Sequence, residues 1–261
     1  MDYKKRCEYL EQRIKHLNLI GIALSTQDDL DKLFEMIMDE AKHITNADGR
    51  TLYMKSDDSK ELKFEILLND SMNSVMGGTS GNEVTLPPVK LFNEEEHPNE
   101  SNVAAYVANT GRTVNIKDAY KEDGFDFSGT KSFDKMTGYR SKSFLTVPLK
   151  NHENEIIGVM QLINSVDKKT NETISFSSEM QTQIESLCSQ GAVALTNKRL
   201  VQELKTLFES FIQLIAKAID EKSPYTGGHC ERVPEITMML ADAVEKVNYG
   251  KYKNFSMTED E

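Results

Sequence analysis

The stretch that most constrains the fold of this chain covers residues 133–164. It contains a turn at Gly138, an apolar run that ends at Leu149, five polar residues, and a second apolar run over 156–164. Both runs are rich in β-branched and aromatic residues, and a polar link of this length is typical of a longer hairpin loop, so the sequence predicts a β-hairpin. Because the second run is apolar almost throughout, with Gln161 as a polar exception, we expect a central strand that is buried on both faces.

Charge and composition exclude several kinds of partner. Lys and Arg total 31 against 42 Asp and Glu, which gives a formal charge of -11. Nucleic acid and anionic membrane surfaces both need a concentrated basic patch, so we expect neither as a partner. No apolar run approaches the roughly 20 residues that span a bilayer, and no signal-peptide core follows the charged start. We therefore expect a soluble chain of one to two domains.

The three cysteines also limit the chemistry. Cys7, Cys188 and Cys230 lie far apart and form no C-x-x-C pair. Neither a disulfide framework nor a cysteine zinc site is indicated, and a reducing cytoplasmic compartment fits best. Cys188 lies among apolar neighbours in a predicted helix, which is the setting of an inert structural thiol.

Apolar residues in heptad spacing mark both ends of the central region. Residues 1–24 carry about three heptads, and a second run from Ser177 or Ser178 keeps the 4-3 spacing for more than about five heptads. The second run is too long for an ordinary globular helix, although Lys198 and Lys205 interrupt it. We expect these helices to pair in a homodimer. As an alternative, the first stripe packs on its own domain. In the second helix, small Gly191 and Ala194 allow either close approach of another helix or close packing onto the sheet.

The other segments predict an α+β domain with an antiparallel sheet flanked by helices. The expected elements are a helix from Asp28 or Asp29 to Ile44, strands at 50–55 and 61–68, a helix from Ser101 or Asn102 to Thr110, and a short strand at 113–116. Residues 118–131 are polar and predict a loop. Within the polar segment 69–98, the glycine-rich residues 77–81 lack the Lys-Ser/Thr pair of a phosphate loop, so we interpret them as a flexible linker.

The 133–164 stretch, FDKMTGYRSKSFLTVPLKNHENEIIGVMQLIN, closely resembles the second half of a GAF domain, in the branch found in cyclic-nucleotide phosphodiesterases and bacterial regulators. The resemblance covers about residues 19–197. It implies a small-molecule sensor in which a mixed α/β sheet holds a ligand beneath short helices and loops. The expected organisation is a dimerisation helix over 1–24, the sensor over 25–177 and a signalling helix over 178–222.

The resemblance also implies which residues contact a ligand. In nucleotide-binding GAF domains the ligand is held by the start of a short helix, by a D-x-x-T-G-[FY] turn and by a polar residue on the next central strand. In this sequence the candidate positions are Val103, Ala104, Asp134, Thr137, Ser141, Gln161 and Asn164. Backbone N–H groups at a helix start suit a phosphate, and a glutamine amide suits a base edge. Alternatively, Asp134 and Thr137 form a local turn and Gln161 bonds to neighbouring backbone.

One departure weakens the expectation of a cyclic nucleotide. The binding branch of the family carries an Asn-Lys pair, a Phe and an Asp-Glu pair, and a Lys-Asp ion pair locks the fold around the pocket. This chain keeps Asn164 and Phe176 but has Ser165 in place of the Lys and Met180-Gln181 in place of Asp-Glu. The ligand therefore remains open between a cyclic mononucleotide, another small molecule, and none.

Residues 211–247 resemble the opening of an HD-GYP domain, a bacterial hydrolase of cyclic di-GMP, on the motif D-x-K-x-P-Y-T-G-G-H-x-E-R-V. In that family the histidine at the position of His229 helps to bind a two- or three-metal centre, of Fe or Mn, and Tyr225 replaces a glutamate found in trinuclear members. No His-Asp pair follows His229, and Gly-Tyr-Pro is absent from the sequence. We therefore expect 223–261 to be the start of this domain, without catalytic activity or cofactor in this chain.

The sequence thus predicts a sensor module of a bacterial cyclic di-GMP phosphodiesterase, which controls the hydrolase through a dimeric helix. The alternative is a ligand-free dimerisation scaffold in which the GAF fold only positions the helices. We expect the complete protein to be a metal-dependent hydrolase.

Overall fold

The computed structural model describes residues 20–24, 26–27, 29–222, 229–247, 249–253 and 255–257. The chain divides into two compact units, Met1–Lys198 and Arg199–Glu261, and the long helix α5 (Ser178–Lys222) continues from one into the other. Most of the helix predicted over 1–24 lies outside the described residues.

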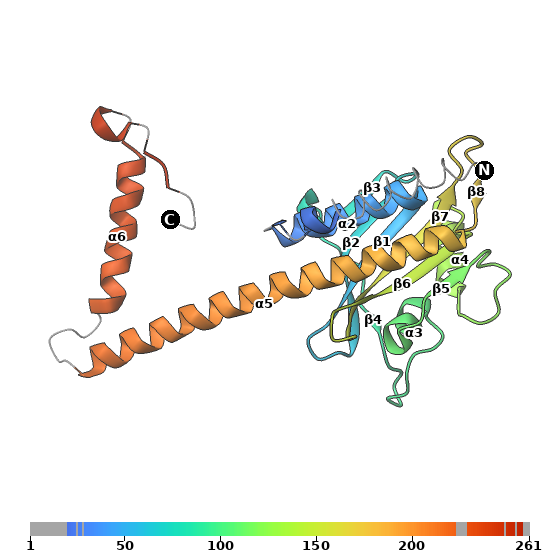
Figure 1. The fold of residues 1–261 in the computed structure, drawn as a ribbon, viewed down its shortest axis with the longest axis horizontal. Helices are drawn as coiled ribbons and strands as arrows, with labels where there is room; N and C mark the ends of the chain where they lie inside the picture. Colours follow the sequence, from blue (N-terminus) through green and yellow to red (C-terminus); the bar gives the residue numbers. More distant parts are fainter. Residues whose placement is uncertain are drawn as a thin grey trace, which may run out of the picture. The chain divides into compact units, whose positions relative to one another are not determined.

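An antiparallel sheet forms the centre of the first unit (Figure 1). Its main strand order is β3-β2-β1-β7-β6-β5, with β4 paired to β2 and β8 paired to β7. The strands are β1 (Ala47–Lys55), β2 (Glu61–Asn69), β3 (Ser74–Gly77), β4 (Val89–Lys90), β5 (Val114–Ile116), β6 (Phe144–Lys150), β7 (Ile156–Val166) and β8 (Thr173–Ile174). The predicted hairpin is therefore confirmed as β6–β7, and β7 is a central strand.

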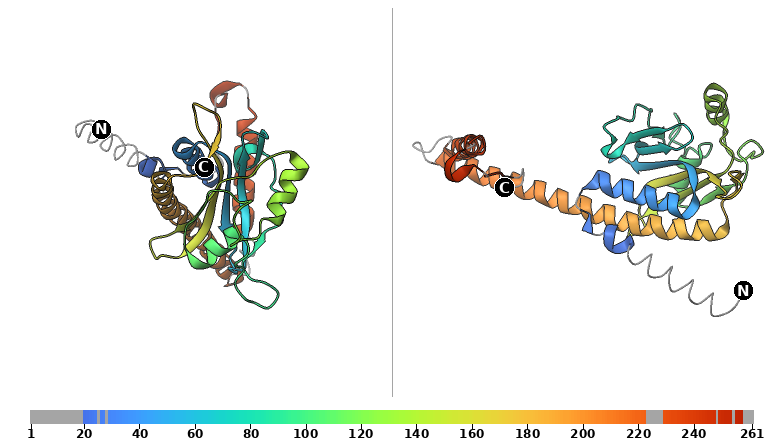
Figure 2. Two further views of the ribbon diagram at one scale, coloured as in Figure 1. Left: turned by 90° about the vertical axis from the view of Figure 1, so that its right-hand side faces the viewer. Right: turned by 90° about the horizontal axis from the view of Figure 1, so that it is seen from above.

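Helix α2 (Leu30–Thr45) and the first part of α5 lie side by side over one face of the sheet (Figures 1 and 2). The side chain of Asp29 accepts hydrogen bonds from two backbone N–H groups in the first turn of α2, as expected of an N-cap. Fully buried Ile37 and Ile184 bring these helices into the largest core cluster, together with Leu145 and Leu162 of the sheet. The first part of the predicted α5 stripe thus packs on its own domain.

The opposite face of the sheet is covered by α3 (Val103–Thr110), α4 (Ser128–Thr137) and the segments around them (Figure 2). Two smaller core clusters form there, one around Tyr53 and Val159 and one around Phe127 and Phe144. This is the face on which the family resemblance places a ligand.

The α+β fold class is confirmed, whereas two local interpretations are wrong. Helix α4 begins within the predicted polar loop and extends into the start of the 133–164 stretch. The glycine-rich segment forms part of β3 and the short helix η1 (Gly78–Ser80), and does not behave as a linker. Gly77 has a φ of 78°, and the Thr79 N–H and hydroxyl donate hydrogen bonds to Glu35 of α2, which fixes the segment against the domain.

In the second unit, α5 continues to Lys222, and α6 (His229–Glu245) and η2 (Gly250–Tyr252) follow. Among the described residues, no helix is both long enough and apolar enough to cross a membrane.

Candidate ligand-binding site

Three polar side chains form a row across the centre of the sheet. Gln161 of β7 lies opposite Thr51 of β1 on one side and opposite Thr146 of β6 on the other. Directly opposed residues project from the same face of an antiparallel sheet. The Gln161 amide joins the row, because its Nε2 donates to Thr146 Oγ1 and its Oε1 accepts from Tyr53 Oη, both at 3.3 Å. These bonds are long, so the half-buried amide has capacity to pair with a ligand.

Helix α3 covers this part of the sheet with its apolar first turn. Val103 packs in the cluster that contains Phe144, and Ala104 packs in the cluster that contains Tyr53. The predicted cap Asn102 is confirmed: its side-chain oxygen accepts from the N–H groups of Ala104 at 3.0 Å and of Ala105 at 3.1 Å. A phosphate at this helix start would therefore compete with Asn102 for the Ala104 N–H.

Two further candidates, Asp134 and Ser141, bond to each other. The buried Asp134 carboxylate accepts from the Ser141 N–H at 2.8 Å, from Ser141 Oγ at 2.7 Å and from Tyr120 Oη at 2.9 Å. Thr137 is exposed, and its hydroxyl donates to the Phe133 carbonyl one helical turn earlier. These groups fix the loop after α4, in agreement with the alternative of a local turn.

Asn164 holds the same loop from the end of β7. Its Oδ1 accepts from the N–H groups of Lys142 at 2.7 Å and Ser143 at 3.2 Å. Its Nδ2 donates to the Arg140 carbonyl at 2.7 Å and to Tyr139 Oη at 3.1 Å. Asn164 has a φ of 57°, a left-handed conformation that asparagine tolerates better than most residues. The whole segment 139–143, which we call the lid loop, is thus attached to the sheet.

Tyr139 is a lid-loop residue to which the sequence assigned no role. Its hydroxyl donates to Asp48 Oδ2 of β1 at 2.5 Å, a short charge-assisted hydrogen bond. Partial burial, and then the Asp48 carboxylate, raise the pKa of Tyr139 above its usual range. The aromatic position of the D-x-x-T-G-[FY] turn was the available signal, but the partner is 91 positions away in the sequence.

The position of the family's ion pair is neutral in this chain. Ser165 Oγ lies 3.9 Å from Met180 Sδ and donates to the Thr45 carbonyl at 2.7 Å. Gln181 Oε1 accepts from Asn115 Nδ2 at 3.0 Å. The end of β7 and the start of α5 therefore still lie against each other. An uncharged contact between Ser165 and Met180 takes the place of the ion pair in the family pattern.

Two surface cavities lie near the outer strands of the sheet. One, of about 430 Å³, is lined in part by Lys60, Lys90 and Phe92. The other, of about 440 Å³, is lined in part by Phe64 and Glu65, and burial raises the pKa of that glutamate. None of the seven predicted ligand positions lines either cavity.

The described part of the chain contains no group of three or more His, Cys, Asp or Glu side chains that could bind a metal ion. His229 begins α6, but its side chain lies outside the described atoms.

Comparisons with known proteins agree with the observed fold. A dual 3′,5′-cyclic-AMP and -GMP phosphodiesterase 11A from Takifugu rubripes is 42% identical over 80 residues, which is 31% of this chain but 8% of the phosphodiesterase. The crystal structure of the GAF domain from an Acinetobacter phosphoenolpyruvate-protein phosphotransferase matches with a TM-score of 0.52 and 14% identity, over 74% of this chain and 98% of that domain.

A further structural match comes from Coxiella burnetii. The GAF domain of its phosphoenolpyruvate-protein phosphotransferase gives a TM-score of 0.52 at 15% identity, over 73% of this chain and 96% of that domain. At such identities the likeness establishes the fold alone. The family model of the GAF domain matches residues 29–195, more than half of the sequence. The chain therefore belongs to the GAF domain family.

Proposed function

We propose that this chain is the small-molecule-sensing module of a bacterial, cytoplasmic signalling protein, and that it controls an HD-GYP cyclic di-GMP phosphodiesterase through a dimeric helix. The observation that carries the proposal is the change of environment along α5. Ile184 and Leu187 are buried in the sensor core, whereas Leu204, Leu207 and Phe208 of the same helix are 62–67% exposed. A helix that is part of the sensor core and continues as an exposed apolar stripe can pass a ligand-induced shift in the sensor to an output domain.

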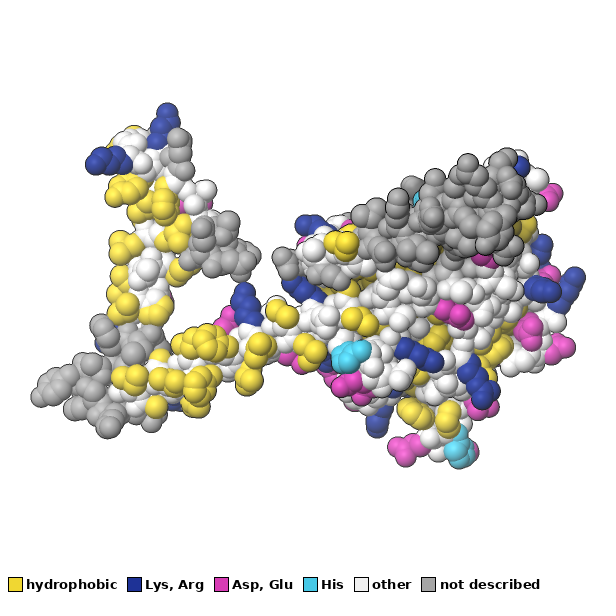
Figure 3. All heavy atoms as spheres, in the orientation of Figure 1, with side chains coloured by type: hydrophobic (Ala, Val, Ile, Leu, Met, Phe, Trp, Pro, Cys, Tyr) yellow, Lys and Arg dark blue, Asp and Glu magenta, His cyan; other side chains and the backbone are white. Residues whose placement is uncertain are grey.

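The exposed stripe of α5 supports a second copy of the chain as the partner. Hydrophobic side chains gather along this part of the helix (Figure 3), and the exposed members are Leu200, Val201, Leu204, Leu207, Phe208, Phe211, Ile212, Leu214, Ile215 and Ile219. A helix with this much exposed apolar surface needs a partner in water. Two copies of one helix offer identical stripes, and the 4-3 spacing is that of a coiled coil.

The polar row beneath α3 supports a small ligand with amide-complementary groups. The Gln161 amide can donate and accept at once, as a nucleobase edge requires. The relative from Takifugu rubripes is named for cyclic AMP and cyclic GMP, which makes a cyclic mononucleotide the first ligand to test. Asn102, which occupies N–H groups of α3, would have to release them for a phosphate.

The output assignment rests on the motif around His229. In the complete protein this histidine would bind a divalent metal, Fe or Mn, together with residues beyond the HD-GYP start. When bound, such a centre would polarise the phosphate of the substrate and activate water for phosphodiester hydrolysis. For the present chain we expect no turnover of cyclic di-GMP and no bound cofactor.

One observation favours the alternative of a ligand-free scaffold. Several candidate groups already bond within the protein: Asp134 with Ser141 and Tyr120, and Asn164 with the lid loop. In a scaffold these bonds would only stabilise the fold. By contrast, both side-chain hydrogen bonds of the Gln161 amide are long, at 3.3 Å.

Native mass spectrometry of the purified chain tests both points together. We expect a dimer, and either a retained small molecule or a mass shift on addition of cyclic AMP or cyclic GMP. Gln161→Ala should weaken that binding without changing the dimer, because the amide makes only long hydrogen bonds in the fold. A dimer that binds neither nucleotide and retains no ligand would favour the scaffold, and a monomer would refute the paired-helix mechanism.

The dimer itself is tested by placing a charge on the stripe. Phe208→Glu adds a carboxylate to the exposed apolar side, and Ser210→Glu, on a different side of the same exposed helix, is the matched control. Phe208→Glu should produce monomers in sedimentation analysis and Ser210→Glu should not. Equal effects of the two variants would show that the stripe is not the interface.

A further inference from the structure

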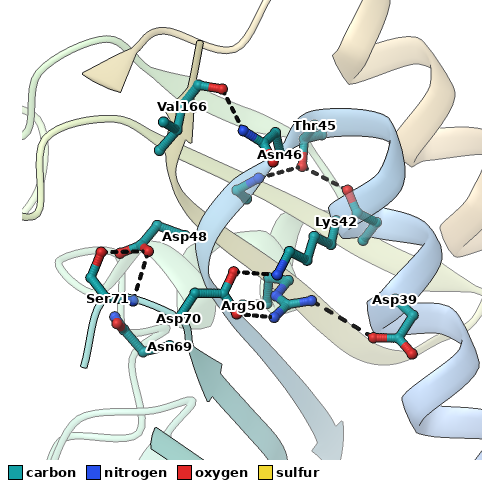
Figure 4. A network of polar contacts seen from close by, with 12 residues as sticks. Asp39, Lys42, Thr45, Asn46, Asp48, Arg50, Asn69, Asp70, Ser71 and Val166 are labelled. Atoms are coloured by element: carbon teal, nitrogen blue, oxygen red, sulfur yellow. Dashed lines mark hydrogen bonds and ion pairs between the residues drawn. The ribbon is translucent and has the colours of Figure 1, made fainter. Parts of the chain in front are cut away.

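We propose that Tyr139 is a positioning residue that connects the lid loop to helix α2 through the carboxylates of Asp48 and Asp70. The proposal rests on the ligand site proposed above and adds the route by which that site would act on the helices. It is built from a continuous series of short polar contacts at one end of β1 and β2, part of which is shown in Figure 4.

The first contact joins the lid loop to β1. Tyr139 Oη donates to Asp48 Oδ2 at 2.5 Å, and Asp48 is 8% exposed. Any movement that opens the lid loop would break this bond and leave the Asp48 carboxylate with one buried partner fewer. Hydrogen bonds to a charged group contribute more to stability than neutral ones. Loss of this bond would therefore weaken the hold on Asp48 and on the residues that Asp48 contacts.

The second contact joins β1 to the turn after β2. Asp48 Oδ1 accepts from the Ser71 N–H at 2.9 Å and from Ser71 Oγ at 2.7 Å. The Asp70 N–H donates to the Asp48 carbonyl at 3.1 Å. Asp48 therefore fixes Asp70 and Ser71 of this turn, and its own position depends on Tyr139.

The third contact joins the turn to α2. The Asp70 carboxylate lies 2.6 Å from Lys42 Nζ of α2 and 2.8 Å from Arg50 Nη2 of β1 (Figure 4). Arg50 is 4% exposed, and its Nε and Nη1 make no hydrogen bond to any residue that the structure describes. Asp39 of α2 is 3.8 Å from Nη1 and 81% exposed, so a small displacement of α2 would change how well this guanidinium is paired.

The last contact joins α2 to α5. A Cβ placed on Gly191 would lie 2.9 Å from Ile37 Cδ1, so the backbone of α5 approaches α2 closely at this point. A packed contact of this kind transmits displacement and does not absorb it. Opening of the lid loop would thus reach α5 through Tyr139, Asp48, the β2–β3 turn and α2.

Hydrogen–deuterium exchange of the ligand-free chain tests the route, and two conservative variants provide the comparison. Tyr139→Phe removes the hydroxyl that donates to Asp48 and accepts from Asn164 Nδ2. Tyr120→Phe removes the hydroxyl that bonds to Asp134 of α4, a contact that involves neither β1 nor α2. Both keep the aromatic ring, and circular dichroism would verify that both variants fold.

Tyr139→Phe should raise exchange by roughly tenfold in the lid loop, in the turn at 70–73 and in the last turn of α2 at 42–46, as expected for the loss of one charge-assisted hydrogen bond. Tyr120→Phe should raise exchange only in α4 and the lid loop, because Asp134 bonds to both Tyr120 and Ser141. In a Lys42→Met background the effect of Tyr139→Phe on 42–46 should fall, whereas its effect on 70–73 should remain.

An increase confined to the lid loop, or the same pattern in both tyrosine variants, would overturn the proposal. Because the measurement uses no ligand, it is independent of whether the sensor binds one. A positive exchange result with no ligand in native mass spectrometry would retain the route and favour the scaffold over the sensor. The reverse result would refute the route alone.

Discussion

The Arg50–Asp70 ion pair should respond very differently to removal of its two members. Asp70 is the close partner of the buried guanidinium, at 2.8 Å, whereas Asp39 is 3.8 Å away. Asp70→Ala would leave a buried cation with no close counterion, and breaking such a pair typically costs about 3–5 kcal/mol. Since Asp70 is 39% exposed and water will enter its place, we expect about 2–3 kcal/mol.

Arg50→Met removes the buried charge itself. The Asp70 carboxylate that remains keeps Lys42 at 2.6 Å and access to water, so it is not stranded. Replacing a buried ion by an apolar side chain of similar length is often neutral, and here it also removes two nitrogens that have no hydrogen-bond partner among the described residues. We expect a change within about 1 kcal/mol, and the double variant should resemble Arg50→Met alone.

Urea unfolding and thermal melting would measure these differences. A loss of 2–3 kcal/mol corresponds to a decrease in Tm of roughly 5–10 °C for a domain of this size. Lys42→Met is the control for the exposed partner of Asp70, and it should cost less than about 1 kcal/mol. The reasoning is refuted if Arg50→Met destabilises the protein as much as Asp70→Ala does.

Three further predictions follow from the packing and the pKa shifts. Gly158→Ala should destabilise by about 3 kcal/mol or more in urea unfolding, because the new Cβ would lie 2.3 Å from the Tyr53 carbonyl oxygen. Gly129→Ala, in α4 with open space around it, should instead stabilise by about 0.5 kcal/mol; a loss would contradict the helix assignment. The folded chain binds the Tyr139 proton more tightly than the unfolded chain, so this contribution is complete below pH about 10 and is lost above it. The Tm should therefore decrease less between about pH 10 and higher pH for Tyr139→Phe than for the original chain.

The sequence was informative where the structure depends on local patterns. Strands β6 and β7 have β-branched, apolar runs, and α3 has its Asn102 cap and Gly111 at the C-terminal end with a φ of 65°. Helix α4 was missed because it has few apolar residues, includes Gly129 and begins without a side-chain cap. Its order comes from the bonds of buried Asp134 to Tyr120 and Ser141, which no periodicity reveals.

The candidate site shows the same division. The resemblance located Gln161 and the start of α3, which the sheet register and the α3 packing bring to one face. It did not locate the partner of Tyr139, because that contact joins strand and loop residues distant in sequence. The buried Arg50 was also unexpected: it lies within a predicted strand, and its charge is tolerated only through Asp70 on the neighbouring turn.

The heptad repeat of α5 gives two structures from one pattern. A helix that packs on a sheet and a helix that packs on another helix both need apolar residues every three or four positions. Burial separates the two uses: Ile184 is fully buried, whereas Phe208 is 62% exposed. Ile184→Pro, which periodicity alone suggests as a test of dimerisation, would therefore disrupt the sensor core. Only substitutions in the exposed part, such as Phe208→Glu, can separate loss of pairing from loss of the fold.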